Sequence, residues 1–204
     1  IIRVSARTGV GIEELKSQIL KCVNKQKEMW KTPAFPRLPV DRVFSIKGSG
    51  TVVTGTLLGG EIHSGERMMI YPQQTSCRVR GIQVHEKETA VCEAGQRSAL
   101  NLAQTERKQN SDRRFVYRGN VIAPEGSMKV SRYVNAKLTL LPQSKRSIEH
   151  QTRLHFYSGT TEVLCRAVPL SCEKVEPGES AYVQLRLEEP AAFCPGDKFI
   201  VRFY

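Results

Sequence analysis

Residues 41–56 read Asp-Arg-Val-Phe-Ser-Ile, then Lys-Gly-Ser, then Gly-Thr-Val-Val-Thr-Gly-Thr. Two runs rich in β-branched and aromatic residues, Arg42–Ile46 and Thr51–Leu58, flank a short stretch of glycine and serine. This composition, with many alternating apolar and polar positions, is typical of consecutive β-strands separated by a turn. The stretch therefore predicts two strands and places the region around it in the all-β class.

The same stretch nearly matches a phosphate-binding loop. Residues 50–56 fit the pattern G-x-x-x-x-G-K-[ST] except for the lysine, whose charge contacts the phosphates. The run also lies among β-branched residues rather than between a strand and a helix. These two departures disfavour nucleotide binding here. The glycines are better explained by bends and by close approach of neighbouring backbones in a barrel.

Strand-like runs continue through the rest of the chain, and we find no convincing helix after residue 40. They are Arg67–Tyr71, Arg78–Val84, Ser98–Leu102, Asn120–Ala123, Tyr133–Leu141, Thr152–Tyr157, Val163–Leu170, Ala181–Leu187 and Phe199–Phe203. Related four-residue turn phrases precede several strands: His63–Glu66, Glu176–Glu179 and Cys194–Asp197. We predict two closed antiparallel β-barrels, residues 41–123 and 124–204, because closure removes exposed strand edges.

The first 40 residues differ from this pattern. Ile1–Val4 is expected to be a short strand, and residues 5–11 a glycine-rich turn. A helix is expected next, from the spacing of Ile12, Leu15, Ile19 and Val23. One strand and one helix cannot bury their own apolar faces, so residues 1–30 look like the C-terminal remnant of an α/β domain. Residues 31–40 hold three prolines and are expected to be a linker.

Composition narrows the function classes. The chain has 204 residues, with 31 Lys and Arg against 20 Asp and Glu, and a net charge of +11. This excess suggests a polyanionic partner, for which nucleic acid is the first candidate. No apolar run approaches the roughly 18 residues of a membrane helix, and no secretion signal stands at the start. We therefore expect a cytoplasmic protein without membrane contact.

The reactive residue types form no recognisable catalytic or metal site. Six cysteines occur without a C-x-x-C pair, so free thiols in a reducing compartment are expected. Four histidines show no metal-ligand spacing, and the G-x-S-x-G pattern of a nucleophilic serine is absent. We expect no metal, no cofactor and no enzymatic activity in the chain itself.

Several phrases, in this order, carry a family resemblance. Ser5-Ala6-Arg7, before a glycine turn and helix, resembles the last guanine-contacting motif of translational GTPases. The other phrases resemble their second domain: Asp41–Phe44, Lys47–Thr56, Arg78–Gln83, Ala94–Arg97 and Arg118–Ile122. Together they are most similar to the selenocysteine-specific elongation factors (SelB). The resemblance covers essentially the whole chain and is strongest up to Ile122.

The resemblance implies a module of a larger factor. Residues 1–30 would end the GTPase domain, and the two barrels would be domains II and III. The chain lacks the phosphate loop, D-x-x-G and N-K-x-D motifs, so GTP and Mg²⁺ would belong to the parent protein. The implied partners are selenocysteinyl-tRNA, the ribosome and, through a C-terminal module not seen in this chain, a messenger RNA hairpin. A monomer is expected.

The resemblance also implies roles for residues of the first barrel. Its site would hold the amino-acid end of the charged tRNA, and a selenol ionises more readily than a thiol or a serine hydroxyl. A pocket with fixed positive charge therefore favours the selenolate. By motif position, Arg42 and Arg97 are the candidate arginines, with Asp41 beside them to orient an arginine or receive the amino group. His85 is added only as a neighbour in sequence. The competing interpretation of Asp41 and Arg42 is a surface ion pair worth at most about 1 kcal/mol.

For the tRNA backbone, phosphate contacts are expected from basic residues of the second barrel. No motif selects them, so the candidates rest on charge alone: Arg132, Lys137, Lys145, Arg146 and Arg153. Salt should weaken such contacts markedly.

Three alternatives stay open at this point. The barrels could belong to a general elongation factor or an initiation-factor subunit, whose neutral amino-acid pocket does not need two arginines. They could be the scaffold of a GTPase-linked enzyme such as a sulfate-activating protein. They could also form a plain RNA-binding protein that acts without GTP, although the Ser-Ala-Arg turn and helix argue against that.

Overall fold

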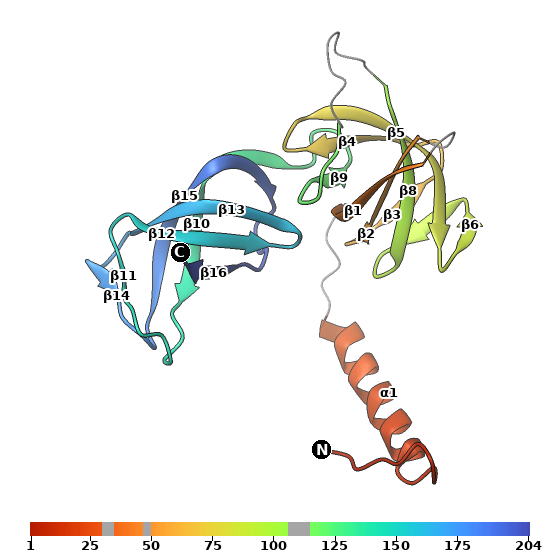
Figure 1. Cartoon of the computed structure of the whole chain (residues 1–204), viewed down its shortest axis with the longest axis horizontal. Coiled ribbons are helices and arrows are strands. Elements are labelled where there is room, and N and C mark those ends of the chain that lie inside the picture. Colours follow the sequence, from red (N-terminus) through yellow and green to blue (C-terminus); the bar gives the residue numbers. More distant parts are fainter. Residues whose placement is uncertain (30–34, 47–49, 106–114) are drawn as a thin grey trace. The chain divides into compact units, whose positions relative to one another are not determined.

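The computed structural model describes residues 1–29, 35–46, 50–105 and 115–204 (Figure 1). The chain divides into two compact units, Ile1–Thr32 and Pro33–Tyr204. Part of the predicted linker, including Pro33, and Lys47–Ser49 of the hairpin connection lie outside the described residues. The second unit carries all the strands, in two sheets and two small ribbons.

The first unit consists of a turn and helix α1 (Ile12–Met29), as its spacing predicts. The Ser5 amide donates to the Val10 carbonyl at 3.0 Å, which closes the turn. Gly11 is required there, since its φ is +75° and a Cβ would lie 2.2 Å from the Arg3 carbonyl oxygen. The predicted strand at Ile1–Val4 is wrong. No described strand pairs with these residues, and a strand without a neighbour has no ladder to stabilise it.

A closed antiparallel ring of six strands forms the first barrel. In ring order they are β4 (Arg67–Tyr71), β9 (Val121–Ala123), β1 (Leu38–Ile46), β2 (Gly50–Thr56), β8 (Arg97–Gln104) and β5 (Thr75–Val84), which pairs with β4 again. Outside the ring, β6 (Lys87–Thr89) pairs with β5, and β3 (Glu61–His63) pairs with β7 (Val91–Glu93). Alternate residues point inward, so Leu38, Val53, Leu100 and Ile122 are fully buried.

The second barrel is built from five strands with a two-stranded ribbon. The sheet order is β10 (Lys129–Thr139), β15 (Ser180–Phe193), β13 (Thr161–Pro169), β12 (Thr152–Ser158) and β16 (Ile200–Phe203); β11 (Ile148–Glu149) pairs with β14 (Lys174–Val175). Among the described residues, no ladder joins the end strands β10 and β16. A groove of about 560 Å³ lies along β10 and is lined by Phe156, Phe193 and Phe199. Hydrogen bonds thus close the first barrel fully, whereas they leave one seam in the second.

A repeated four-residue turn connects many of these strands. In each copy, the third residue is a glycine with positive φ, and the fourth donates its amide to the carbonyl of the first at 3.0–3.2 Å. The side-chain oxygen of the fourth residue then accepts the amide of the first. This occurs at His63–Glu66, Glu176–Glu179 and Cys194–Asp197, as the recurring phrase suggests, and also at Glu93–Gln96 and Tyr117–Asn120.

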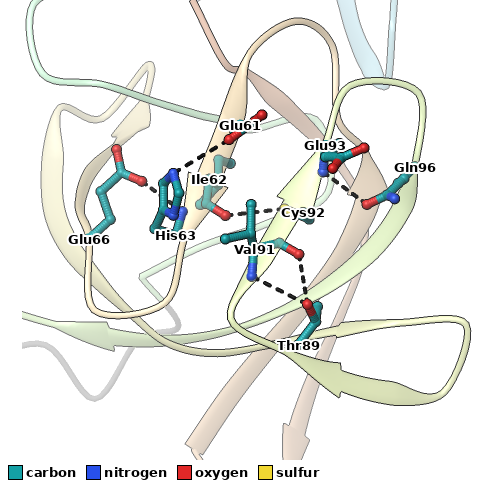
Figure 2. A network of polar contacts seen from close by, with 9 residues as sticks. All are labelled: Glu61, Ile62, His63, Glu66, Thr89, Val91, Cys92, Glu93 and Gln96. Atoms are coloured by element: carbon teal, nitrogen blue, oxygen red, sulfur yellow. Dashed lines mark hydrogen bonds and ion pairs between the residues drawn. The ribbon is translucent and has the colours of Figure 1, made fainter.

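Figure 2 shows two of these turns on either side of the β3–β7 ribbon, Glu66 bonded to the His63 amide and Gln96 bonded to the Glu93 amide. Each turn provides hydrogen-bond acceptors for two of its own backbone amides. Its fourth residue must have a side-chain oxygen that can accept the amide of the first residue, three positions earlier. The turns therefore fix where strands begin, including β8, which opens at Arg97 immediately after such a turn.

An ion pair and an apolar cluster join the two barrels. Arg37 donates to both carboxylate oxygens of Asp197, at 2.8 and 2.5 Å, and both side chains are largely buried. The Asp197 carboxylate also accepts the Cys194 amide at 2.9 Å. Thr161 Oγ1 donates to the Gly119 carbonyl at 2.8 Å. A separate buried cluster contributes apolar packing at this junction: Tyr71, Val121, Ala123, Met128 and Ala192.

Candidate functional site

A β-bulge in β1 positions the first predicted site residue. Val40 faces Gly55 and Arg42 faces Thr54, so Asp41 is an extra residue in the strand. Gly55 is required beside it, because a Cβ there would lie 2.3 Å from the Pro39 carbonyl oxygen. The bulge directs the Asp41 carboxylate across β2 towards the start of β8.

At that point Asp41 meets Arg97. The Arg97 guanidinium donates to both carboxylate oxygens: Nη1 to Oδ2, and Nη2 to Oδ1 at 3.1 Å. Thr54 Oγ1 donates to the same Oδ1 at 2.7 Å. The carboxylate is thus held from two strands, and the bidentate bond fixes the orientation of the Arg97 guanidinium.

The pair is strongly coupled but open to solvent. Hydrogen bonding from Arg97, then from Thr54, lowers the pKa of Asp41 below its usual range, and the charge of Arg42 acts in the same direction. The Asp41 carboxylate in turn raises the pKa of Arg97. The Arg97 side chain is 52% exposed and that of Asp41 27% exposed. A pair this accessible contributes at most about 1 kcal/mol to stability, so its geometry matters more than its energy.

A groove lies on the same outer face of the barrel. It encloses about 600 Å³, and its floor includes Val52, Gly81 and Ala99. Ala99 is two residues from Arg97 on β8, so both point to the same side of the sheet. Arg80, Gln83, Glu88 and Asn101 add polar groups to the lining. Asn101 Oδ1 is buried and accepts no hydrogen bond from any described protein group.

Arg42 and His85 stand at the edges of this arrangement. Arg42 faces Thr54 across the strand pair, is exposed, and forms no ion pair among the described residues. His85 lies in the turn between β5 and β6, one residue beyond Val84, which pairs with Ser98. The structure thus brings Asp41, Arg42 and Arg97 together. It places His85 beside the site without a polar contact to it in the described part of the chain.

Nucleophilic and metal chemistry find no support in the described residues. Burial raises the pKa of the Cys77 thiol to about 12 and that of Cys165 to about 11, so both stay protonated and unreactive at neutral pH. No cluster of His, Cys, Asp or Glu in the described ranges could hold a metal ion. None of the described helices is long and apolar enough to cross a membrane.

Comparison with known proteins identifies the family. Residues 135–203 match the model of the β-barrel domain of selenocysteine-specific elongation factor. The whole chain is 39% identical to the factor of that name from Desulfomicrobium baculatum, of which it covers 31%. It is 29% identical to the Methanocaldococcus jannaschii factor over 98% of the chain, which covers 44% of that relative. The chain belongs to the family of selenocysteine-specific elongation factors.

Solved structures of this family share the fold. The apo SelB of Methanococcus maripaludis matches 97% of the chain with a TM-score of 0.78 and 26% identity, and the chain covers 44% of it. A bacterial factor, EF-Sec, matches 98% with a TM-score of 0.74 and 29% identity, and the chain covers 31% of it. A second M. maripaludis structure holds the GTP analogue GppNHp. The chain thus spans between about a third and under half the length of these SelB proteins.

In the second barrel, the candidates chosen by charge do not form one cluster. Arg132 donates to the Glu188 carbonyl at 2.7 Å, and Arg153 donates to the Glu188 carboxylate at 3.2 and 3.4 Å. Two candidates also cover aromatic rings: Arg146 lies 4.8 Å from the centre of Phe203, and Arg153 lies 4.6 Å from that of Tyr204. Lys137, on β10, faces Tyr182, and Lys145 lies in the loop before β11. Arg132 and Arg153 thus meet at Glu188, whereas the two lysines lie elsewhere.

Sequence reasoning missed two polar residues of the first-barrel site. Thr54 lies in the quoted motif, but only the bulge at Asp41 turns its hydroxyl into a ligand of that carboxylate. The sequence pattern could have identified Asn101. It is a polar residue between Leu100 and Leu102, which are apolar and buried, so its side chain points to the opposite face of the strand.

Proposed function

We propose that this chain is the aminoacyl-tRNA-binding module of a selenocysteine-specific elongation factor, which delivers selenocysteinyl-tRNA to the ribosome in a GTP-dependent way. The observation that carries the proposal is the Arg97–Asp41–Thr54 arrangement beside the 600 Å³ groove. Family membership suggests that the substrate is an aminoacyl-tRNA. The Arg97–Asp41–Thr54 arrangement suggests how its amino acid would be recognised.

The chemistry follows from charge. Thr54 holds Asp41, and Asp41 holds Arg97 two residues from Ala99 of the groove lining. Arg42 adds a second positive charge. Two arginines against one carboxylate leave the site cationic, so a selenolate entering it gains a charge-assisted contact. The serine side chain is neutral and would desolvate the arginines without pairing them. The Asp41 oxygens can also receive the amino group of the aminoacyl ester.

The remaining roles rest on family membership. GTP and Mg²⁺ would bind to the parent protein, with Ser5, Ala6 and Arg7 in its guanine-contacting turn. The second barrel would hold the tRNA backbone, for which Arg153 and Arg146 are the best supported because aromatic rings hold their guanidinium planes. The ribosome and a messenger RNA hairpin would be further partners, in the cytoplasm, and the factor would act as a monomer.

A general elongation or initiation factor remains the second candidate function. The cationic site argues against it, since a pocket for a neutral side chain gains nothing from Arg97 and Arg42. Two other functions were considered: a scaffold for an enzyme, and RNA binding that is independent of GTP. Neither would explain the Arg97–Asp41 geometry.

Hydrolysis of the aminoacyl ester tests the proposal. The full-length factor with GTP should protect selenocysteinyl-tRNA much better than seryl-tRNA carried by the same tRNA. Arg97→Ala should lose about 10- to 100-fold of that preference, the value of a hydrogen bond to a charged group. Arg67→Ala, at an exposed arginine on β4, is the control and should keep it. Equal protection of both tRNAs by the unaltered factor would favour a general delivery factor, and protection of neither would favour the scaffold.

A further inference from the structure

The second barrel has one open seam, and the directions of its strands limit what could close it. In the order β10, β15, β13, β12 and β16, each strand runs antiparallel to the next. The end strands β10 and β16 therefore run in the same direction. One further strand between them would be antiparallel to both, and it would complete a ring of six strands like that of the first barrel. The seam thus has the right strand directions for one extended segment.

The edge of β10 faces this seam. Five consecutive residues of the strand, 133–137, line the groove of about 560 Å³. Successive side chains point to opposite faces of a strand, so a groove lined by every residue in turn lies along the strand edge. Most of the remaining lining comes from the segment 193–199, which leads from β15 into β16. The groove therefore lies between one end strand and the segment that enters the other.

The backbone of this edge has hydrogen-bonding groups without partners. The Leu140 amide donates to the Glu179 carbonyl at 2.9 Å, so the backbone of Leu140 faces β15. The register with β15 is continuous from Tyr133 onward, and backbone groups alternate between the two edges of a strand. Those of Asn135 and Lys137 therefore face the seam. Within the described part of the chain, neither is bonded to a backbone group outside the strand ladders, so each offers a donor and an acceptor.

Two neighbouring contacts agree with this arrangement and limit its length. Thr139 Oγ1 and Ser180 Oγ lie 2.7 Å apart, the close side-chain approach of an antiparallel pair that exchanges no backbone bonds. Thr139 therefore faces the seam in the same way as Asn135. At the other end, the Ser131 hydroxyl accepts the Tyr133 amide and donates to the Tyr133 carbonyl, both at 2.9 Å. The unpaired edge thus begins after Tyr133.

Apolar side chains also line the groove. Phe156 packs against two others: its ring centre lies 5.4 Å from that of Phe193 and 5.5 Å from that of Phe199. Val134 and Ala136 add aliphatic surface from β10, and both are only half-buried. A segment with an apolar residue at every second position would cover this surface, while its other side chains reach solvent.

The charges that line the groove favour an acidic segment. Lys129 and Lys137 are exposed there, and the carboxylate of Asp197 is already bonded to Arg37. The groove therefore has a surplus of positive charge along β10. A second copy of this chain, with its net charge of +11, would be repelled, whereas glutamate or aspartate side chains would be attracted.

We propose that the seam of the second barrel binds an extended acidic segment of a partner protein, which pairs with β10 as a sixth, antiparallel strand. In strand addition of this kind, main-chain hydrogen bonds supply affinity, and the contacts of alternate side chains supply specificity. Asn135 and Lys137 supply the main-chain bonds, the phenylalanines supply the apolar contacts, and the two lysines select acidic side chains. The lined positions 133–137 span about 17 Å, the length of about five extended residues.

Amide hydrogen exchange in this chain tests the pairing, with a blocked peptide of about seven alternating valine and glutamate residues as the probe. Without the peptide, the amides of Asn135 and Lys137 should exchange about 10-fold or more faster than those of Val134 and Ala136, which face β15. With saturating peptide, the two seam-facing amides should slow by about 10-fold or more. This readout reports backbone pairing at particular residues, which general attraction between opposite charges does not produce.

Two altered peptides separate the contributions of backbone and charge. The first has methylated backbone nitrogens, so it keeps its side chains but cannot donate to β10. It should bind at least about 10-fold more weakly. The second has lysine in place of every glutamate, and at low salt it should also bind about 10-fold more weakly. Binding of either peptide as tight as that of the original would overturn the inference.

A matched pair of variants tests the same edge from the side of the chain. Asn135→Pro removes a seam-facing amide that the ladder with β15 does not use, and it should weaken binding of the peptide about 5- to 10-fold. Asn135→Ala removes the side chain but keeps the amide, and it should change the affinity by less than about twofold. If the proline variant does not fold, the methylated peptide provides the same test on the unaltered chain.

Other results of the exchange experiment would also overturn the inference. One is that saturating peptide leaves the exchange of the Asn135 and Lys137 amides unchanged. Slowing that grows with the concentration of the chain alone would assign the seam to a second copy. Slowing by an RNA oligonucleotide, but not by the acidic peptide, would assign the seam to nucleic acid.

Discussion

Two arginine–aspartate ion pairs in this chain have the same chemistry but differ in how far they are buried. Both are bidentate. Arg37 and Asp197 lie at the junction of the barrels, with side chains 13% and 19% exposed, whereas Arg97 and Asp41 lie on the outer face of the first barrel at 52% and 27%. The buried pair is enclosed and joins the two barrels. The exposed pair ends beside a groove, where its arginine can still meet a ligand.

The difference shows how burial separates a pair that holds two parts of the fold together from a pair whose arginine stays accessible to solvent. A buried pair that loses one partner leaves an uncompensated charge, which is costly, while an exposed pair loses little. The exposed pair is therefore free to carry a function at almost no cost in stability. The two sites can be tested separately on this basis.

The largest expected effect is at the junction. Asp197→Asn should lower the free energy of unfolding by about 3 kcal/mol, because Arg37 keeps a buried charge without its partner. Urea denaturation of the variant and the unaltered chain measures this. Asn can still accept the Cys194 amide, so the turn itself should persist. A loss below about 1 kcal/mol would show that the junction pair behaves like the exposed one and would break the comparison.

A smaller and pH-dependent effect is expected on the outer face. The pKa of Asp41 is lowered in the folded chain, so its pairing stabilises the fold above the unfolded value of about 3.9 and the stabilisation is lost as the pH falls through the folded pKa. Asp41→Asn should therefore cost at most about 1 kcal/mol at pH 7.

The difference in unfolding free energy between Asp41→Asn and the unaltered chain should close when the pH falls below about 4. Urea midpoints of the two proteins between about pH 7 and about pH 2 provide the measurement. A gap that stays constant over this whole range, or that exceeds about 3 kcal/mol at neutral pH, would contradict the assignment of Asp41 to an accessible pair.

Much of the β architecture could be predicted from local signals. Alternation and glycine turns located the long strands, since a strand with one buried face must alternate. The short strands β3, β6, β7, β11 and β14 were missed, because two or three residues carry no period. Strand β15 was predicted to end at Leu187 but continues to Phe193. Its last residues pair with the start of β10, and such long-range pairing leaves no local signal.

The candidate site was also predictable only in part. Motif resemblance selected Asp41, Arg42 and Arg97, which the structure brings together. The alignment of Arg153 with Arg166 and Arg186 was not predicted, because these residues are far apart in sequence and meet only through strand register. Charge alone chose Lys137 and Lys145, whose positions the sequence could not relate to the other candidates.

One measurement tests the central claim most directly. Affinities of the full-length factor for selenocysteinyl-tRNA and seryl-tRNA should be compared for Arg97→Gln and for the control Arg67→Gln. We predict that Arg97→Gln lowers the preference for the selenocysteinyl form by about 10-fold or more. The control variant should keep the preference of the unaltered factor. An unchanged preference in Arg97→Gln, or an equal loss of preference in Arg67→Gln, would contradict the assignment of side-chain recognition to Arg97.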